Sequence, residues 1–182
     1  DPNLINRTQE QLSAKQMTID YYKNKVDVTQ TQIGALSSGR ELKLNQLENK
    51  LAQLRLKVQS DSMEAIAANN DFNIATQQYN RQKAMYDSGL VSLTQLEQRN
   101  QSYQNAQAKK VSAENKLANS RQDLTITKIE MNSVQQEYLE KIAKAQGDQF
   151  QSMSQIATSQ GDIAKLENQY SNYTIRNGMY YI

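Results

Sequence analysis

The chain has 182 residues, of which 37% are hydrophobic, and its mean hydropathy is −0.82. Globular domains usually carry roughly 45–50% apolar residues when glycine is included, so one compact domain with a large core is not expected. The 21 basic and 19 acidic residues are interspersed and leave a net charge of +2. Because no basic stripe results, nucleic acid is not an expected partner.

The composition instead favours long helices. The chain holds 25 Gln and 17 Asn, but only one Pro and six Gly interrupt it. A coiled coil tolerates so polar a sequence, because each helix buries only a narrow seam. A disordered Gln-rich linker is the competing interpretation, and the regular apolar spacing described below argues against it. No apolar run approaches the ~20 residues of a membrane span, so any anchor is expected outside this sequence.

The first predicted helix covers about residues 2–33. Asp1 suits the N-cap position and Pro2 the first helical position. An alternating three-four spacing of apolar residues follows, in which Thr8, Lys15 and Thr29 also take part, so the amphipathic face is loosely specified. The apolar members are Ile5, Leu12, Ile19, Tyr22, Val26, Ile33 and Leu36.

The second predicted helix covers about residues 39–87 and follows a predicted break at Gly34–Gly39. Ser38 and Glu41 have the spacing of a capping box, which marks a new helix start. The apolar pattern is then sustained over six heptads, with only Asp61 and Gln82 polar, and this predicts a coiled coil. Its members are Leu44, Leu47, Leu51, Leu54, Val58, Ala65, Ala68, Phe72, Ala75, Tyr79 and Tyr86.

A tight turn is predicted at residues 88–92, within the stretch Tyr86–Ser92. Gly89 suits the left-handed residue that ends a helix in a Schellman motif. In that frame, Leu90 is expected to pack back on Met85. The chain therefore reverses direction within a few residues.

The next helix is predicted to start directly after this turn. Ser92 is the expected N-cap, and Gln95 three residues later completes a capping box. Val91 and Leu96 have the spacing of a hydrophobic staple across that cap. The stop at Gly89 and the start at Ser92 together predict a helical hairpin.

The third predicted helix covers about residues 93–170. Two successive four-residue steps at Val134, Tyr138 and Ile142 form a stutter, which locally unwinds a supercoil. The apolar pattern consists of Leu96, Tyr103, Ala106, Ala113, Leu117, Leu124, Met131, Val134 and Tyr138, and then Ile142, Ala145, Ile156, Ile163, Leu166 and Tyr170. Residues 171–182 change character. Alternation at 173–176, the Asn177–Gly178 pair and the apolar end predict strands of a truncated β-structured domain.

Helix lengths predict the topology. At 1.5 Å per residue the third helix would extend ~117 Å, the second ~72 Å and the first ~48 Å. The first two together match the third, so the expected fold is all-α: a long antiparallel coiled-coil hairpin whose ascending arm is broken into two helices. Symmetric pairing about the turn places the break at 37–39 opposite the stutter at 138–142. A three-helix bundle, with the first helix folded back, remains an alternative.

No catalytic constellation is present in the sequence. The chain has no His and no Cys, which removes the commonest general base and most transition-metal ligands. No glycine-rich phosphate loop occurs. Carboxylates such as Glu41 and Glu48 lie at helical spacing beside Lys and Arg, as on a solvated helix face. Neither an enzyme nor a bound cofactor or metal is expected, and the tyrosines on the apolar pattern, among them Tyr86, are expected in the core.

The segment from Arg81 to Ser92 resembles the hairpin tip of periplasmic adaptor proteins, the membrane fusion proteins of hemolysin-secretion and drug-efflux systems. Their tip pattern is Arg, three residues, Leu, six residues, Ser or Thr, and Arg81, Met85 and Ser92 stand at those positions. Methionine in place of leucine conserves volume. The resemblance implies that these three residues bind the partner, while Ser88, Gly89, Leu90 and Val91 shape the tip.

The resemblance also implies partners and a location. Such proteins lie in the periplasm, are anchored to the inner membrane, assemble as hexamers, and join an inner-membrane transporter to an outer-membrane channel of the TolC kind, in type I secretion or efflux. The two ends of the chain are similar to the points where the hairpin leaves and re-enters a lipoyl-like domain. The alternative function is a generic antiparallel coiled-coil spacer or scaffold that binds partners along its length.

Overall fold

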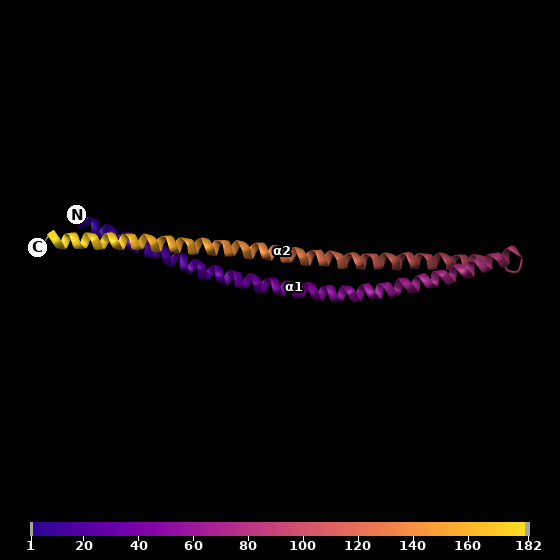
Figure 1. Cartoon of the computed structure of the whole chain (residues 1–182). Helices are drawn as coiled ribbons and strands as arrows, with labels where there is room; N and C mark the ends of the chain where they lie inside the picture. The colour runs from indigo at the N-terminus through magenta and orange to yellow at the C-terminus, as the bar shows by residue number, and fades with distance from the viewer. Residues whose placement is uncertain (1, 181–182) are drawn as a thin grey trace. The chain divides into compact units, whose positions relative to one another are not determined.

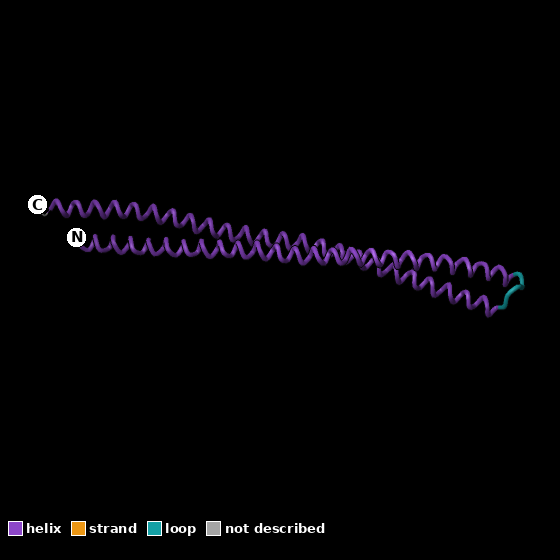
Figure 2. Tube along the Cα trace, turned by 90° about the horizontal axis from the view of Figure 1, so that it is seen from below, coloured by secondary structure: helices purple, strands orange, loops and turns teal. Residues whose placement is uncertain are grey.

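The computed structural model describes residues 2–180, and two helices account for nearly all of them. Helix α1 spans Pro2–Asp87 and helix α2 spans Leu93–Tyr180. The turn at residues 88–92 reverses the chain, so the helices form an antiparallel helical hairpin, as predicted (Figures 1 and 2). Asp1, the predicted N-cap, lies outside the described residues. Neither helix contains a stretch that is long and apolar enough to span a membrane, within the part of the chain that is described.

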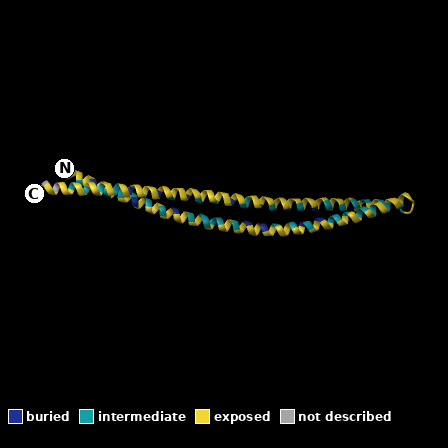
Figure 3. Cartoon of the chain, viewed as in Figure 1, coloured by how far each residue is buried: buried dark blue, intermediate teal, exposed yellow. Residues whose placement is uncertain are grey.

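The chain divides into two units, each built from both helices. One unit contains residues 43–133 and includes the turn, and the other contains residues 1–42 and 134–182. In each unit the buried and half-buried residues lie along the faces where α1 and α2 meet, and the outer faces are exposed (Figure 3). For residues 2–180 this narrow seam forms the core, which explains how so polar a sequence folds.

In the unit of residues 43–133, the predicted coiled-coil pattern forms the seam. Leu47 and Leu51 are 4% and 6% exposed, and Ala65 and Ala113 are also buried. The alanine-rich middle of the predicted pattern is therefore part of the buried seam.

An aromatic cluster fills the seam of this unit toward the turn. The ring of Tyr103 lies 5.4 Å from that of Phe72 and 5.5 Å from that of Tyr79, measured between centroids. Lys110 Nζ lies 4.9 Å from the centroid of the Phe72 ring. These contacts bear out the predicted core role of Tyr79 and Tyr103. The prediction for Tyr86 is wrong: its side chain is 38% exposed, because Met85 takes the inward position at the end of α1.

In the other unit, small polar residues fill part of the seam. Ile19 and Ala145 are each 3% exposed, and Thr8, Thr29 and Ser152 are buried beside such apolar residues. The Thr8 and Thr29 hydroxyls donate to carbonyl oxygens four residues earlier, at 2.8 and 2.6 Å. These bonds satisfy hydroxyl groups that burial would otherwise penalise. The polar residues in the apolar pattern of the first predicted helix are therefore compatible with a packed interface.

The predicted break at 34–39 is wrong, because α1 continues through it. The half-buried positions of α1 step by four at Leu36, Arg40 and Leu44, and this stutter matches the one predicted in α2 around Tyr138. A Cβ added to Gly39 would lie 3.5 Å from the Tyr138 ring, so the two stutters do face each other as the pairing predicted. Packing of matched stutters keeps the helix intact despite two glycines and a capping-box sequence. The ascending arm is therefore one helix, and the folded-back alternative is excluded.

The predicted strands after residue 170 are also wrong for the described residues, since α2 extends to Tyr180. A type I′ turn at Asn177–Gly178 needs positive φ at both central residues. Gly89 is the one described residue with positive φ, so this turn does not form. Tyr170 and Tyr173 are half-buried at the spacing of the α2 seam, so the helical pattern continues where short alternation suggested strand. The expected strand residues Tyr181 and Ile182 lie outside the described residues.

Candidate functional site

The end of α1 is a complete Schellman motif. The N–H of Leu90 donates to the Met85 carbonyl oxygen at 2.9 Å, and the N–H of Gly89 donates to the Tyr86 carbonyl oxygen at 2.9 Å. Gly89 has a φ of 74°, the left-handed conformation that this motif requires and that side chains with a Cβ disfavour. Backbone geometry alone therefore accounts for glycine at this position.

The start of α2 is a reciprocal capping box. The N–H of Gln95 donates to Ser92 Oγ at 3.2 Å, and the N–H of Ser92 donates to Gln95 Oε1 at 3.0 Å. Two N–H groups that the first turn of a helix leaves without partners are thus satisfied. Val91 and Leu96 on either side of the cap are half-buried, as in a hydrophobic staple. Ser92 consequently has a structural role whatever else it does.

The turn presents an apolar side chain to solvent. Leu90 is 72% exposed, so the expected packing of its side chain on Met85 contributes little, although the backbone bond between them forms. Leu93, the first residue of α2, is 52% exposed. Ser88 and Gly89 are exposed as well. Sequence reasoning identified the turn but missed Leu93, because this residue is not part of the apolar pattern of the helix that follows.

Arg81 lies on the exposed surface of α1 one helical turn before Met85. Residues four apart occupy the same side of a helix, so Arg81 and Met85 are neighbours there, and Met85 is half-buried. Within residues 2–180, Arg81 makes no hydrogen bond or ion pair, whereas Arg99 Nη1 on α2 donates to Gln78 Oε1 at 3.1 Å. A cation near a helix C-terminus is favoured by only about 0.3–1 kcal/mol. Among the described residues, the Arg81 guanidinium is therefore left without a partner, beside a turn whose helix ends are capped.

A hollow of about 580 Å³ lies next to the turn, between the ends of the two helices. Polar side chains dominate its walls, and Met85 and Val91 supply the apolar ones. Its lining residues are Gln82, Met85, Val91, Gln95, Gln98, Arg99 and Ser102. The glutamine amides can donate and accept hydrogen bonds with a polar partner surface, and the Arg99 guanidinium can donate them. The sequence patterns drew attention to neither Gln98 nor Arg99, because both lie on the polar face of α2.

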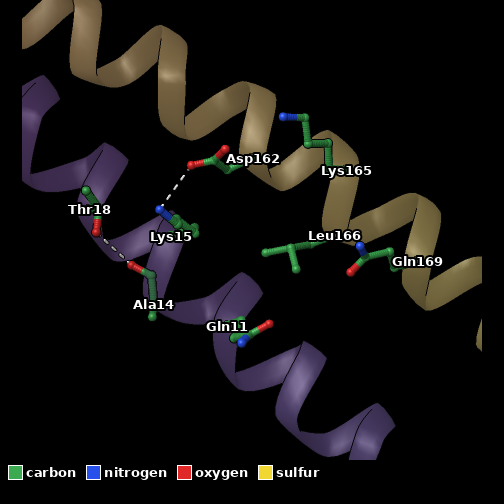
Figure 4. Close-up of a pocket in the computed structure, with 8 residues that line it drawn as sticks. All are labelled: Gln11, Ala14, Lys15, Thr18, Asp162, Lys165, Leu166 and Gln169. Atoms are coloured by element: carbon green, nitrogen blue, oxygen red, sulfur yellow. Dashed lines mark hydrogen bonds and ion pairs between the residues drawn. The ribbon is translucent and has the colours of Figure 1, made fainter.

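A second hollow lies in the unit of the chain ends, where Lys15 meets Asp162 (Figure 4). Its volume is about 450 Å³, and Lys15 Nζ lies 3.1 Å from Asp162 Oδ2. Both side chains are more than a third exposed, so this pair contributes at most about 1 kcal/mol to stability. Leu166 and Gln169 flank the pair. This hollow is an ordinary feature of a solvated helix interface.

The titratable groups show surface ion pairing. The hydrogen bond from Lys141 Nζ to Glu137 Oε1, 2.7 Å long, holds the pKa of Glu137 below its ordinary value and raises the pKa of Lys141. A hydrogen bond to Glu64 likewise raises the pKa of Lys116. All three side chains are about half exposed. Among the described residues, no cluster of His, Cys, Asp and Glu has the arrangement of a metal site.

These features define a class of structure: an antiparallel coiled-coil hairpin with a capped, tight turn. In sequence, the chain matches no protein-family profile and no protein of curated function. In structure it is similar to the periplasmic adaptor protein EmrA, with a TM-score of 0.70 and 12% sequence identity. The likeness covers 91% of this chain and 51% of the EmrA chain, so this chain spans about half the length of that structure. At this identity the likeness establishes a shared fold.

Proposed function

We propose that this chain is the helical hairpin arm of a periplasmic adaptor, which docks by its turn onto an outer-membrane channel of the TolC kind. The arm acts in a tripartite type I secretion or efflux system, in the periplasm, with the inner-membrane anchor and the transporter contacts supplied by parts of the protein outside this sequence. Its role is mechanical: several hairpins surround a conduit, and their tips meet the helical ends of the channel.

The observation that carries this proposal is that Arg81, which makes no bond to the rest of the described hairpin, stands at the arginine position of the adaptor tip pattern beside a turn that is already fully capped. The bonds of Met85, Gly89 and Ser92 explain the reversal of the chain without any partner. Arg81 contributes nothing comparable to the fold. The fold likeness to a periplasmic adaptor supports the same assignment.

A further surface supports assembly of several copies, for which we propose a hexamer. Exposed apolar side chains recur on the outer face of α1 in the unit of residues 43–133: Leu56, Met63, Ile66 and Ile74 are between 53% and 68% exposed. Isolated exposed leucines are ordinary, but a row of them along one helix suits contact with another chain. In the proposed ring, neighbouring hairpins cover this row.

The same row favours the alternative function, a coiled-coil spacer or scaffold that binds partners along its length. The two functions differ in what happens at the turn. A scaffold is insensitive to changes at Arg81 and sensitive to polar substitution of Leu56 or Met63. An adaptor is sensitive at Arg81, because the turn is where it meets the channel.

The test is charge reversal at Arg81 in the full-length protein, with Lys83→Glu as the matched control. Both residues are exposed cations on the last turns of α1, so the two substitutions change the net charge equally. We expect Arg81→Glu to abolish export of the native cargo and Lys83→Glu to leave it near the wild-type level. Circular dichroism of both variants should match wild type, since neither side chain packs in the seam. Normal export by Arg81→Glu would refute docking through this residue.

Ser92 needs a test that separates capping from docking. Ser92→Asp keeps an oxygen that accepts the N–H of Gln95, because aspartate is as good an N-cap as serine. We expect this variant to fold as the wild type does and to lose export through the added charge and bulk at the contact. Ser92→Asp with full export would restrict Ser92 to its cap.

A further inference from the structure

A carboxylate is buried in the apolar seam of the unit formed by residues 43–133. Asp61 is 3% exposed, and it interrupts the coiled-coil pattern between Val58 and Ala65. Across the seam, Ser120 is fully buried and donates a hydrogen bond from Oγ to Asp61 Oδ2. Lys116 Nζ lies 3.6 Å from Asp61 Oδ1. The carboxylate therefore has partners from α2 on both of its oxygens.

Lys116 connects this buried group to the surface. Its ammonium lies 2.8 Å from Glu64 Oε2, and both of these side chains are about half exposed. The Ser120 hydroxyl oxygen also lies 2.9 Å from the Lys116 carbonyl oxygen, which fixes the position of the serine on α2. Asp61 on α1 thus contacts both Ser120 and Lys116, which lie four residues apart on α2. Of these two residues, Glu64 contacts Lys116 alone.

A buried charge is costly without partners, and replacing a buried ionic group by an apolar one often leaves a protein as stable or more stable. What such a group provides is specificity, because it penalises arrangements in which it loses its partners. Alanine and leucine contacts along the seam discriminate poorly between registers shifted by one heptad, because such a shift exchanges one apolar side chain for another, as with Leu117 and Leu124. Asp61 does discriminate between these registers.

A shift of α2 by one heptad in one direction places Ala113 opposite Asp61. Alanine has no donor, so the carboxylate would lose the hydrogen bond that Ser120 provides. Lys109 would then occupy the place of Lys116, so the ion pair survives and the buried hydrogen bond is the penalty.

A shift in the other direction places Thr127 opposite Asp61 and preserves a hydroxyl. Asp123, four residues before Thr127, then takes the place of Lys116. An aspartate there would face the carboxylates of Asp61 and Glu64 without a cation. Each direction of slip is therefore penalised by a different loss.

We propose that Asp61, Ser120 and Lys116 fix the register of α1 against α2 in this unit independently of the turn. A tight turn also fixes the register of a hairpin, but only as long as its caps remain intact. With a second determinant in the arm, rearrangement of residues 88–92 leaves the pairing of the helices unchanged.

The test removes the constraint of the turn and asks whether the register persists. A flexible Gly-Ser segment of seven residues is inserted between Gly89 and Leu90, in an otherwise native chain and in an Asp61→Leu chain. Asn45→Cys and Asn115→Cys, both exposed positions in a chain without cysteine, carry nitroxide labels. Native pairing offsets them by roughly 20 residues, or about 30 Å, and a one-heptad slip changes the offset by roughly 10 Å.

Pulsed electron paramagnetic resonance should give one distance for the extended-turn chain with Asp61. With Asp61→Leu it should give a second population displaced by roughly 10 Å. Asp71→Leu, an exposed aspartate on the same helix, is the control and should keep one distance. Ser120→Ala tests the same cluster from α2 and should also broaden the register. A single native distance in both the Asp61→Leu and Ser120→Ala chains would overturn the proposal, as would several distances with Asp61 intact.

Discussion

Alanine in place of Gly34 and Gly39 tests whether α1 is truly continuous. The sequence around these residues resembles a helix break, in which the first helix ends near Ile33 and Gly34 follows it in a left-handed conformation. In the structure both glycines are helical with ordinary negative φ. The sign of the stability change distinguishes the two arrangements, because alanine stabilises a helix interior and destabilises a left-handed position.

The magnitude follows from the surroundings of each residue. A Cβ added to Gly34 meets nothing within 4 Å, and one added to Gly39 meets the Tyr138 ring at 3.5 Å, an ordinary van der Waals distance. Each substitution should therefore stabilise the chain by about 0.5–1 kcal/mol, and the double variant by about 1–2 kcal/mol. Gly89→Ala is the control of opposite sign: at a φ of 74° alanine should cost about 1–2 kcal/mol.

Thermal unfolding followed by circular dichroism at 222 nm measures these effects. For a chain of this size, 1 kcal/mol corresponds to roughly 2–4 °C in Tm. We expect Tm to rise in the Gly34→Ala and Gly39→Ala variants and to fall in Gly89→Ala. A lower Tm in Gly34→Ala, with Gly39→Ala raised, would refute the continuous helix at Gly34 and restore a break there.

Two further predictions concern the turn and the surface. Ser92→Ala should lower the free energy of unfolding by about 1 kcal/mol. In a double-mutant cycle, Gln95→Ala should cost less when Ser92 is already alanine, because the two residues cap the helix reciprocally. Additive effects of the two substitutions in denaturant titrations would contradict the capping box. Lys141 lowers the pKa of Glu137, so the stabilisation from their pair is present above the ordinary pKa of glutamate and is lost as the pH falls through the lowered value. Side-chain NMR titration should show this low pKa in the wild type, and an ordinary one in Lys141→Met.

The sequence predicted the seam well because burial of apolar residues at three-four spacing is the main force that aligns two helices. Leu47, Leu51, Ala113 and Ala145 are all buried where the pattern placed them. The turn was also predictable down to its hydrogen bonds. The Schellman motif and the capping box depend on local backbone chemistry, which Gly89 and the Ser92–Gln95 pair specify without reference to the rest of the chain.

The errors arose where local signals competed with packing. Ser38 and Glu41 fit a capping box, but Gly39 faces the Tyr138 ring, and packing at the matched stutters favours an uninterrupted helix. Asn177–Gly178 is a strong turn signal in isolation, yet it follows seam positions that extend α2. Sequence patterns report the preference of a segment on its own, whereas a long interface adds the preference of its partner helix.

The buried Asp61 shows a second limit of prediction from sequence, since its position was visible in the pattern but its role was not. As a polar residue among leucines and alanines it looked like a simple defect in the seam. Its meaning depends on which residue of α2 stands opposite, and on Asp123 and Lys116 being one heptad apart. At the turn, residues whose bonds close within the hairpin are explained by folding. Arg81 is not, and what separates it from Lys83, another exposed cation without a bond to the hairpin, is its place in the adaptor tip pattern.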